Sequence, residues 1–252
     1  MEKLISIEVT GLSPSVRGFC TTRHGGVSQG AYAWLNLGDH VGDDPDCVRE
    51  NRRLLREHLP SDPFWLEQVH GNRVIVVDAD VTDVRPRADA LVTTQKNRVL
   101  PVLIADCLPI VLADDSGQVL GVAHAGWRGL AGGVLQQTLS AMREQVRHLG
   151  AWRAWVGPGI GATAFEVGPD VVQAFVAVDP DFKRHFVRDL NQDQKWHCDL
   201  SGLARQLLVA MGATDVSLSG CCTFSDPQKR FFSYRRDGQT GRMATVVWLS
   251  SS

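Results

Sequence analysis

The run FWLEQVHGNRVIVVD, residues 64–78, contains two short apolar segments, and RVLPVLI, residues 98–104, adds a third. These segments, 64–69, 73–78 and 98–104, are rich in Val, Ile, Phe and Trp, which is typical of β-strands. No helix signal separates them, so the chain lacks the regular strand–helix alternation of a parallel α/β sheet. The stretch therefore predicts an α+β fold, with a mixed sheet, or two packed sheets, flanked by helices.

The remaining elements are expected from apolar runs and from residues that begin or end helices. Further strands are expected at 119–124, 152–157, 215–219, 230–234 and 244–249. Four helices are expected: from Asp44-Pro45 to about Leu59, from Gly129 to Leu149 with Gly150 as the stop, from Gly168-Pro169 to Val178, and from Asp199 to Gly212. No repeat and no long linker divides the 252 residues, so a single domain over 1–252 is expected.

The overall charge limits the classes of partner. The formal net charge is −2, so no positive field surrounds the whole molecule to hold nucleic acid or an anionic membrane. Arginine nevertheless supplies 21 of the 26 basic residues, and its planar fork suits bidentate binding of oxyanions. We therefore expect small-molecule partners, with any phosphate held locally by arginine, and a monomer or homodimer.

The chain also lacks the signals of membrane or secreted proteins. No apolar run approaches the roughly 20 residues of a membrane span. Glu2, Lys3 and Glu8 interrupt the first apolar positions, which predicts a cytoplasmic protein without a secretory signal. Six cysteines are too few and too irregular for a disulfide framework, and Cys20, Cys47 and Cys198 are interpreted as structural.

One glycine-rich stretch formally matches a nucleotide-binding motif. Residues 157–162, GPGIGA, fit G-x-G-x-x-A after an apolar segment. A dinucleotide site requires that this loop open directly into a helix, whereas here AFEV and a second Gly-Pro intervene. A Rossmann site is therefore not expected, and the P-loop, esterase-elbow, zinc-protease and zinc-deaminase motifs are absent from the sequence.

Three metal-ligating residues lie at the ends of predicted strands or apolar runs. His70 closes FWLEQVH, Cys107 lies in LIADCLPI, and His124 closes VLGVAH. Two imidazoles and one thiolate suit zinc and leave a fourth tetrahedral position for water or substrate, which indicates catalysis and not a structural site. The separations of 37 and 17 residues match no local zinc-finger spacing. The alternative to a metal site is therefore that these three are ordinary buried His and Cys side chains.

The same side chains also allow two other chemistries. Cys107 could act as a thiolate nucleophile with His124 as its base, as in a cysteine hydrolase or amidase. Copper could occupy the His/Cys set, as in a phenol oxidase. The eight histidines form no H-x-H pair, which disfavours the trinuclear cluster of a conventional laccase.

Arginines in three glycine-rich segments are candidates for binding phosphate. Arg128 lies in AGWRG, where unpaired amides precede the second predicted helix. Arg23 lies in TTRHGG, and Arg235 and Arg236 lie in SYRRDGQTGR. The last segment is interpreted as a hairpin turn around Asp237-Gly238. Asp106, beside Cys107, could orient a ligand histidine or point out of the site.

Taken together, the motifs resemble those of the YfiH/YlmD family, long labelled multicopper polyphenol oxidase or laccase-like and related to human FAMIN. The motifs that carry the resemblance run in order from Thr21 to Ala244: TTRHGGVSQG, WLNLGDHVGDDP, VRENR, LEQVHG, ADCLPI, HAGWRGL, GPGIGATAFEVG and FFSYRRDGQTGRMA. The resemblance implies zinc bound by His70, Cys107 and His124. It also implies a single α+β domain with a mixed β-sandwich flanked by helices, related to toxin deamidases that use a Cys-His pair.

The resemblance further implies enzymatic activities. Members of the family are described as phosphorylases of adenosine, inosine, guanosine and S-methyl-5′-thioadenosine that also deaminate adenosine. Some bacterial members are described instead as amidases that remove L-Ser from UDP-MurNAc, and others as copper-dependent phenol oxidases. Ala162 and Thr163 depart from the family, since many members have Pro and another residue there. We expect a zinc-dependent purine nucleoside phosphorylase with adenosine deaminase activity, with the other two activities as alternatives.

Overall fold

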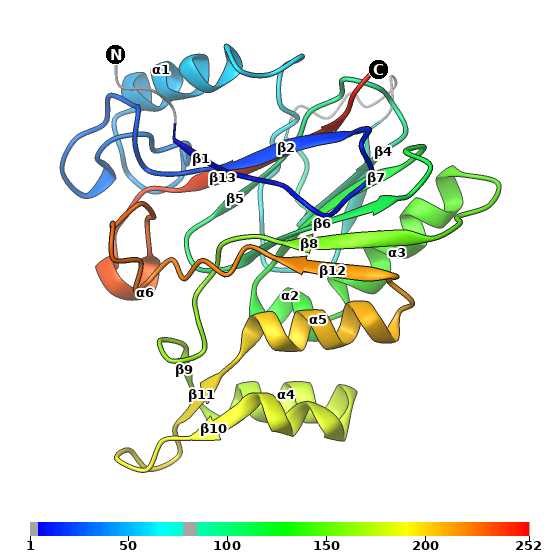
Figure 1. Cartoon of the computed structure of the whole chain (residues 1–252). Helices are drawn as coiled ribbons and strands as arrows, with labels where there is room; N and C mark the ends of the chain where they lie inside the picture. Colours follow the sequence, from blue (N-terminus) through cyan, green and yellow to red (C-terminus); the bar gives the residue numbers. More distant parts are fainter. Residues whose placement is uncertain (1–4, 78–84, 252) are drawn as a thin grey trace.

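The computed structural model describes residues 5–77 and 85–251, which form three sheets and the helices around them (Figure 1). The largest sheet has the order β12-β8-β6-β7-β4-β3. Its strands are β3 (Val74–Val76), β4 (Ala90–Thr93), β6 (Leu108–Asp114), β7 (Leu120–Ala125), β8 (Trp152–Val156) and β12 (Asp215–Leu218). A four-stranded sheet, β1-β2-β13-β5, contains β1 (Ser6–Glu8), β2 (Val16–Thr21), β5 (Leu100–Ile104) and β13 (Met243–Leu249). A small sheet, β10-β11-β9, contains β9 (Glu166–Val167), β10 (Phe186–Arg188) and β11 (Trp196–Cys198).

The two larger sheets pack face to face. Side chains alternate along β6, so Val111 and Ala113 share a buried cluster with Leu100 and Val102 of the opposing sheet. Parallel pairing at β3–β4 and β8–β12 and antiparallel pairing elsewhere make the larger sheet mixed. The prediction of an α+β fold with a mixed β-sandwich is therefore confirmed.

Helices cover both outer faces of this sandwich (Figure 1). The helical elements are η1 (Gly30–Tyr32), α1 (Pro45–Arg56), α2 (Trp127–Ala131), α3 (Val134–Gln145), α4 (Pro169–Val178), η2 (Pro180–His185), α5 (Leu200–Ala210) and α6 (Tyr234–Asp237). On one side, Leu55 of α1 packs in a cluster with Phe19 and Val246 of the four-stranded sheet. On the other side, α3, α4 and α5 bury their apolar faces with Ile110 and Leu112 of β6. No helix among the described residues is both long enough and apolar enough to cross a membrane.

The first, third and fourth predicted helices begin where their capping residues indicate. Asp44 accepts the backbone N–H of Asp46, and Asp199 accepts that of Gly202. The helix expected at 129–149 is instead divided into α2 and α3, because Gly132 and Gly133 interrupt it and Gly133 has a φ of +86°. It also ends at Gln145, before the expected stop at Gly150.

Two predicted strands are wrong. Residues 64–69 do not form a strand: the side-chain amide of Gln68 instead pairs with both backbone groups of Leu103, accepting at 2.7 Å and donating at 2.9 Å. Residues 230–234 lead into α6, where the Ser233 hydroxyl accepts the N–H of Arg236 as an N-cap. The segment around Asp237-Gly238 is therefore the end of a helical turn and not a hairpin.

Candidate metal centre

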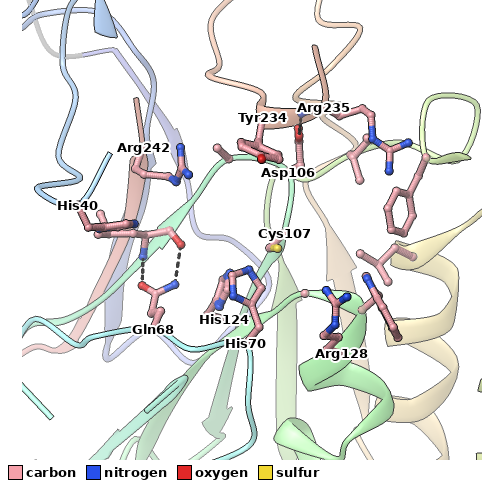
Figure 2. A pocket seen from close by; sticks show the side chains of 17 residues that line it. His40, Gln68, His70, Asp106, Cys107, His124, Arg128, Tyr234, Arg235 and Arg242 are labelled. Carbon is pink, nitrogen blue, oxygen red and sulfur yellow. Dashed lines mark hydrogen bonds between the residues drawn. The ribbon is translucent and has the colours of Figure 1, made fainter. Parts of the chain in front are cut away.

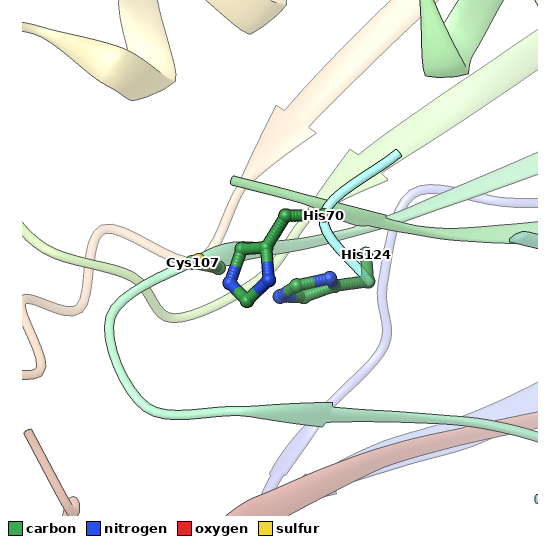
Figure 3. Close-up of side chains that lie close together, drawn as sticks. All are labelled: His70, Cys107 and His124. Carbon is green, nitrogen blue, oxygen red and sulfur yellow. The ribbon is translucent and has the colours of Figure 1, made fainter. Parts of the chain in front are cut away.

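Cys107 and His124 are brought together by the antiparallel pairing of β6 and β7. Pro109 lies opposite His124, so Cys107, immediately before β6, is its diagonal neighbour on the same face of the sheet. His124 is buried, whereas Cys107 is partly exposed. The pair lies where two central strands of the six-stranded sheet begin and end, and His70 lies beside it (Figure 3).

His70 is contributed by the turn that replaces the first predicted strand. The backbone N–H groups of Val69, His70 and Gly71 all donate to the Asp89 carboxylate, at 3.2, 2.9 and 2.7 Å. This turn gives His70 a left-handed backbone with φ near +60°, which is uncommon for a residue other than glycine. The fixed turn directs an otherwise exposed imidazole toward the other two side chains (Figure 3).

The three side chains form a compact donor set. One ligand atom of each lies within 4.8 Å of the others, and the two imidazole rings meet edge to face at 76°. Nδ1 of His124 lies 2.9 Å from the Asp89 carboxylate, which leaves Nε2 available for a metal. Two imidazoles and one thiolate fit zinc or copper, and the buried Asp89 carboxylate orients the His124 imidazole. Within residues 5–77 and 85–251, this is the one cluster of three or more such side chains.

The surroundings favour the thiolate form of Cys107. Burial opposes ionisation, but the His124 and His70 imidazoles outweigh it and lower the pKa of the thiol. Burial likewise opposes protonation of His124, but the neighbouring Cys107 and Asp89 raise the pKa of this imidazole. A thiolate is the form of Cys107 that binds metal, whereas His124 must release its proton to act as a ligand.

Glycine is required beside the donor set. A Cβ atom at Gly126 would lie 2.8 Å from Sγ of Cys107 and 3.1 Å from Cδ2 of His70. A Cβ at Gly129 would lie 2.8 Å from the carbonyl oxygen of Gly71. These two glycines let α2 approach the turn that carries His70 closely.

The donor set opens into a cavity of about 500 Å³ (Figure 2). Its walls are contributed by segments from the whole sandwich: His40, Gln68, His70, Leu103, Ala105, Asp106, Cys107, His124, Gly126, Trp127, Arg128, Ile160, Phe165, Leu200, Tyr234, Arg235 and Arg242. A cavity of this size accommodates a small organic substrate.

Two of the predicted phosphate-binding arginines line this cavity. The exposed Arg128 lies over the ring of Trp127, 4.4 Å from its centroid. Arg235 is also exposed, donates to the carbonyl oxygen of Glu166 at 2.8 Å and lies over the ring of Phe165. Neither has a carboxylate partner within the described residues.

Arg23 and Arg236 do not line the cavity. The Arg23 guanidinium donates to the carbonyl of Ala33 and lies over the ring of Phe232. That of Arg236 is paired with Asp237 and also binds the carbonyl oxygens of residues 223, 224 and 231. These contacts hold the loops around the cavity in place, so the structure offers no support for phosphate binding by either arginine.

Asp106 connects the loop that carries Cys107 to the C-terminal segment. Its carboxylate accepts the Thr223 hydroxyl at 2.6 Å and the backbone N–H of Arg235 at 2.7 Å. Its backbone oxygen accepts the N–H of Ile160. Asp106 therefore orients the loop that carries Arg235, and within the described residues its carboxylate makes no hydrogen bond to His70 or His124.

Sequence reasoning missed Asp89, and it included Arg242 only as one of three arginines in the C-terminal turn that could converge on phosphate. Asp89 is fully buried and is flanked by Ala88 and Ala90 just before a buried strand. A lone carboxylate in such an apolar setting is a signal that was available in the sequence. Arg242 lies at the end of the C-terminal glycine-rich segment, and only the folded chain shows that it lines the cavity.

Comparison with known proteins identifies the family. Residues 17–250 match the family described as multi-copper polyphenol oxidoreductase laccase. The chain belongs to this family. The resemblance to the YfiH/YlmD proteins is thereby confirmed, and relatives and solved structures agree.

A purine nucleoside phosphorylase of Pseudomonas aeruginosa is 48% identical over 234 residues, or 93% of each chain. The Escherichia coli protein named purine nucleoside phosphorylase YfiH is 43% identical over 231 residues, covering 91% of this chain and 92% of the relative. A crystal structure of a Neisseria meningitidis protein assigned to DUF152 has a TM-score of 0.89 and 41% identity over 99% of this chain and 100% of that one. YfiH of Bacillus licheniformis has a TM-score of 0.85 and 29% identity over 93% of each chain.

Proposed function

We propose that this protein is a zinc-dependent purine nucleoside phosphorylase acting on adenosine, inosine, guanosine and S-methyl-5′-thioadenosine, with adenosine deaminase activity. The observation that carries the proposal is the set of His70, Cys107 and His124 at a cavity that also presents aromatic rings and guanidinium groups without a carboxylate partner among the described residues. The names of several relatives support the phosphorylase part.

The cavity offers the two kinds of surface that phosphorolysis requires. Arginine side chains bind phosphate through paired N–H donors, and the rings of Trp127 and Phe165 offer flat apolar faces to a purine. In the reaction, a phosphate oxygen bonds to C1′ while the bond from C1′ to the purine nitrogen breaks. The electron pair goes to the purine, which takes the proton released from hydrogen phosphate, and the products are ribose 1-phosphate and the free base.

The protein's own contribution is to fix the metal ligands and the substrate. Zinc held by His70, Cys107 and His124 would supply Lewis acidity and activate water near neutral pH, as deamination at purine C6 requires. Asp89 orients the His124 ring and fixes the turn that carries His70. These fixed positions reduce the motion that must be lost when the substrate binds.

Product analysis tests the proposal directly. Purified protein is incubated with adenosine, with and without inorganic phosphate, and adenine, inosine and hypoxanthine are separated by chromatography. Adenine that appears only with phosphate establishes phosphorolysis, and inosine in both conditions establishes deamination. Cys107→Ala and His124→Ala are expected to abolish both while circular dichroism shows an intact fold. Full phosphorolysis by either variant would contradict the role of the donor set.

A second candidate function is a Cys-His amidase on a cell-wall precursor such as UDP-MurNAc carrying L-Ser. The observation that favours it is the chain of contacts from Cys107 through His124 to Asp89, which has the order of nucleophile, base and orienting carboxylate. An amidase of this type retains activity after chelation and loses it on alkylation of Cys107. Phosphorolysis by the zinc enzyme is expected to be lost under both treatments.

Copper chemistry is distinguished by oxygen consumption. The family description names copper, and copper binds such sites more tightly than zinc does. A phenol oxidase would consume oxygen in proportion to bound copper. The zinc-loaded protein is expected to consume none with a phenolic substrate while it still cleaves adenosine.

A further inference from the structure

The cavity has two chemically different sides, separated by the metal-ligating residues (Figure 2). Arg128 and Arg235 lie on one side of Cys107, each over an aromatic ring, those of Trp127 and Phe165. On the other side lie three polar side chains, His40, Gln68 and Arg242, and the Arg242 guanidinium lies 5.9 Å from the centroid of the exposed Tyr234 ring. We call these the aromatic side and the Arg242 side.

Arg242 is a half-buried cation without a carboxylate partner. One nitrogen of its guanidinium, Nη1, donates to the carbonyl oxygens of Thr240 and Gly241, at 2.9 and 3.0 Å. No ion pair joins it to any carboxylate in residues 5–77 and 85–251. The bonds at Nη1 fix the side chain, while Nε and Nη2 make no hydrogen bond to the described residues.

Two other shielded arginines, Arg52 and Arg230, differ in this respect. Arg52 is paired with Asp39 at 3.3 Å, and Arg230 is paired with Asp226 at 2.6 Å. A cation withdrawn from water needs an opposite charge or strong acceptors, and these two have them within the protein. Arg242 faces a cavity instead, so its anionic partner is to be sought among the substrates.

The electrostatic setting is consistent with that conclusion. Burial lowers the pKa of Arg242, and the groups that oppose this most strongly are Cys107 and Asp106. Arg242 and the three residues of the donor set line the same cavity. Asp106 already accepts hydrogen bonds from Thr223 and Arg235, so its carboxylate is not free to pair with Arg242.

We infer that Arg242 binds the attacking phosphate, and that the purine lies on the aromatic side between Trp127 and Phe165. The inference rests on the proposed phosphorylase function and specifies the orientation of its substrates. The C1′ atom then lies between the two sides, above the metal-ligating residues. The phosphate oxygen reaches it from the Arg242 side, and the purine leaves with the bonding electron pair toward the aromatic side.

The rigid wall around Arg242 supports this assignment. The Gln68 side-chain amide makes two hydrogen bonds to the Leu103 backbone, and these bonds fix the cavity wall next to Arg242. The Cγ atom of Arg242 packs so closely on Gly38 that a Cβ there would lie 2.7 Å away. A fixed guanidinium binds an anion at a smaller entropic cost than the exposed Arg128 and Arg235 do.

Steady-state kinetics of zinc-loaded variants test the orientation. Arg242→Gln is expected to raise the KM for phosphate by about 10- to 100-fold, because charge-assisted hydrogen bonds are lost, and to raise the KM for adenosine much less. Phe165→Ala is expected to raise the KM for adenosine and to raise the KM for phosphate much less. Arg143→Gln, an exposed residue of α3 outside the cavity, is the matched control and should change neither. Equal effects of Arg242→Gln on both KM values, or a larger effect on adenosine, overturn the inference.

Phosphate binding without turnover separates this inference from the proposed function. Inorganic phosphate is expected to raise the Tm of the wild-type protein and of Arg143→Gln, but not that of Arg242→Gln. Arg242→Lys, which keeps the charge but not the planar fork, should recover part of the shift. An equal shift in Arg242→Gln, or no shift in the wild type, overturns the role of Arg242. If the Tm shift behaves as expected but adenosine yields no adenine, the phosphorylase proposal alone fails.

Discussion

The carboxylate of Asp89 lies 2.9 Å from Nδ1 of His124 and accepts the backbone N–H of His70 at the same distance. One buried side chain therefore positions two of the three residues of the donor set. Burial opposes its ionisation, but the hydrogen bonds from His124 and from the 69–71 turn outweigh it and hold the pKa of Asp89 below its ordinary value. Asp89 is a positioning residue for the donor set and is not one of its three members.

Asp89→Asn is expected to weaken zinc binding by about 10- to 100-fold. Asparagine keeps the shape, but its amide nitrogen replaces an oxygen that accepts from either Gly71 or His124, so one buried donor loses its acceptor. Zinc affinity is measured by competition with a chromophoric chelator. Asp106→Asn, beside Cys107 but bonded to the C-terminal loop, is the control and should keep zinc affinity within about threefold. Unchanged affinity in Asp89→Asn would show that Asp89 serves the fold alone.

The sequence could predict much of the donor set because its members end apolar runs. Cys107 and His124 each stand at the edge of a buried strand, where a side chain is held rigidly. Asp89 could not be placed in the same way, because its proximity to His124 depends on the register of β4 against β7. Ala90 lies opposite Ala123, which sets Asp89 opposite His124 across 35 residues of sequence.

The predicted strand and helix that the structure contradicts also have local causes. Residues 64–69 have strand-like composition. Here, however, the Gln68 side-chain amide makes the hydrogen bonds to the Leu103 backbone that a neighbouring strand would otherwise make, and composition does not reveal this. The division of the 129–149 helix follows from two consecutive glycines, Gly132 and Gly133, and was available in the sequence. Arg242 and Gln68 meet at the cavity only through the packing of β5 between their segments, a long-range contact that no local pattern encodes.

Gly126→Ala is expected to lower zinc affinity and activity by at least about tenfold with a small change in Tm. The new Cβ would lie 2.8 Å from Sγ of Cys107, so the thiolate or the His70 ring must move. Zinc content after dialysis and the rate of adenine release are compared with those of Gly150→Ala. That control adds the same methyl group where no atom lies within 4 Å. Wild-type zinc content in Gly126→Ala would mean that the donor set tolerates this shift.

Thr223→Val is expected to lower the free energy of unfolding by about 1–3 kcal/mol, because Asp106 would lose the hydroxyl that donates to its buried carboxylate. Chemical denaturation measures this change. Thr138→Val removes a hydroxyl bonded only to the helix carbonyl of Val134, so it should cost less than about 1 kcal/mol. A loss in Thr223→Val no larger than in Thr138→Val would show that the contact with Asp106 contributes little.

The ion pair between Asp226 and Arg230 predicts a pH dependence of stability away from the metal centre. Burial opposes ionisation of Asp226, but hydrogen bonds from Arg230 outweigh it and place the pKa of this carboxyl below its ordinary value. The folded state thus binds the proton less readily than the unfolded state, whose carboxyl titrates near about 3.9. The stabilisation is fully present above that pH and is lost as the pH falls through the lower folded value. Denaturation of the wild type and Asp226→Asn from pH 7 to pH 3 should show a difference in unfolding free energy that shrinks below about pH 4. A difference that is constant over this range would contradict the assignment of the charge to Asp226.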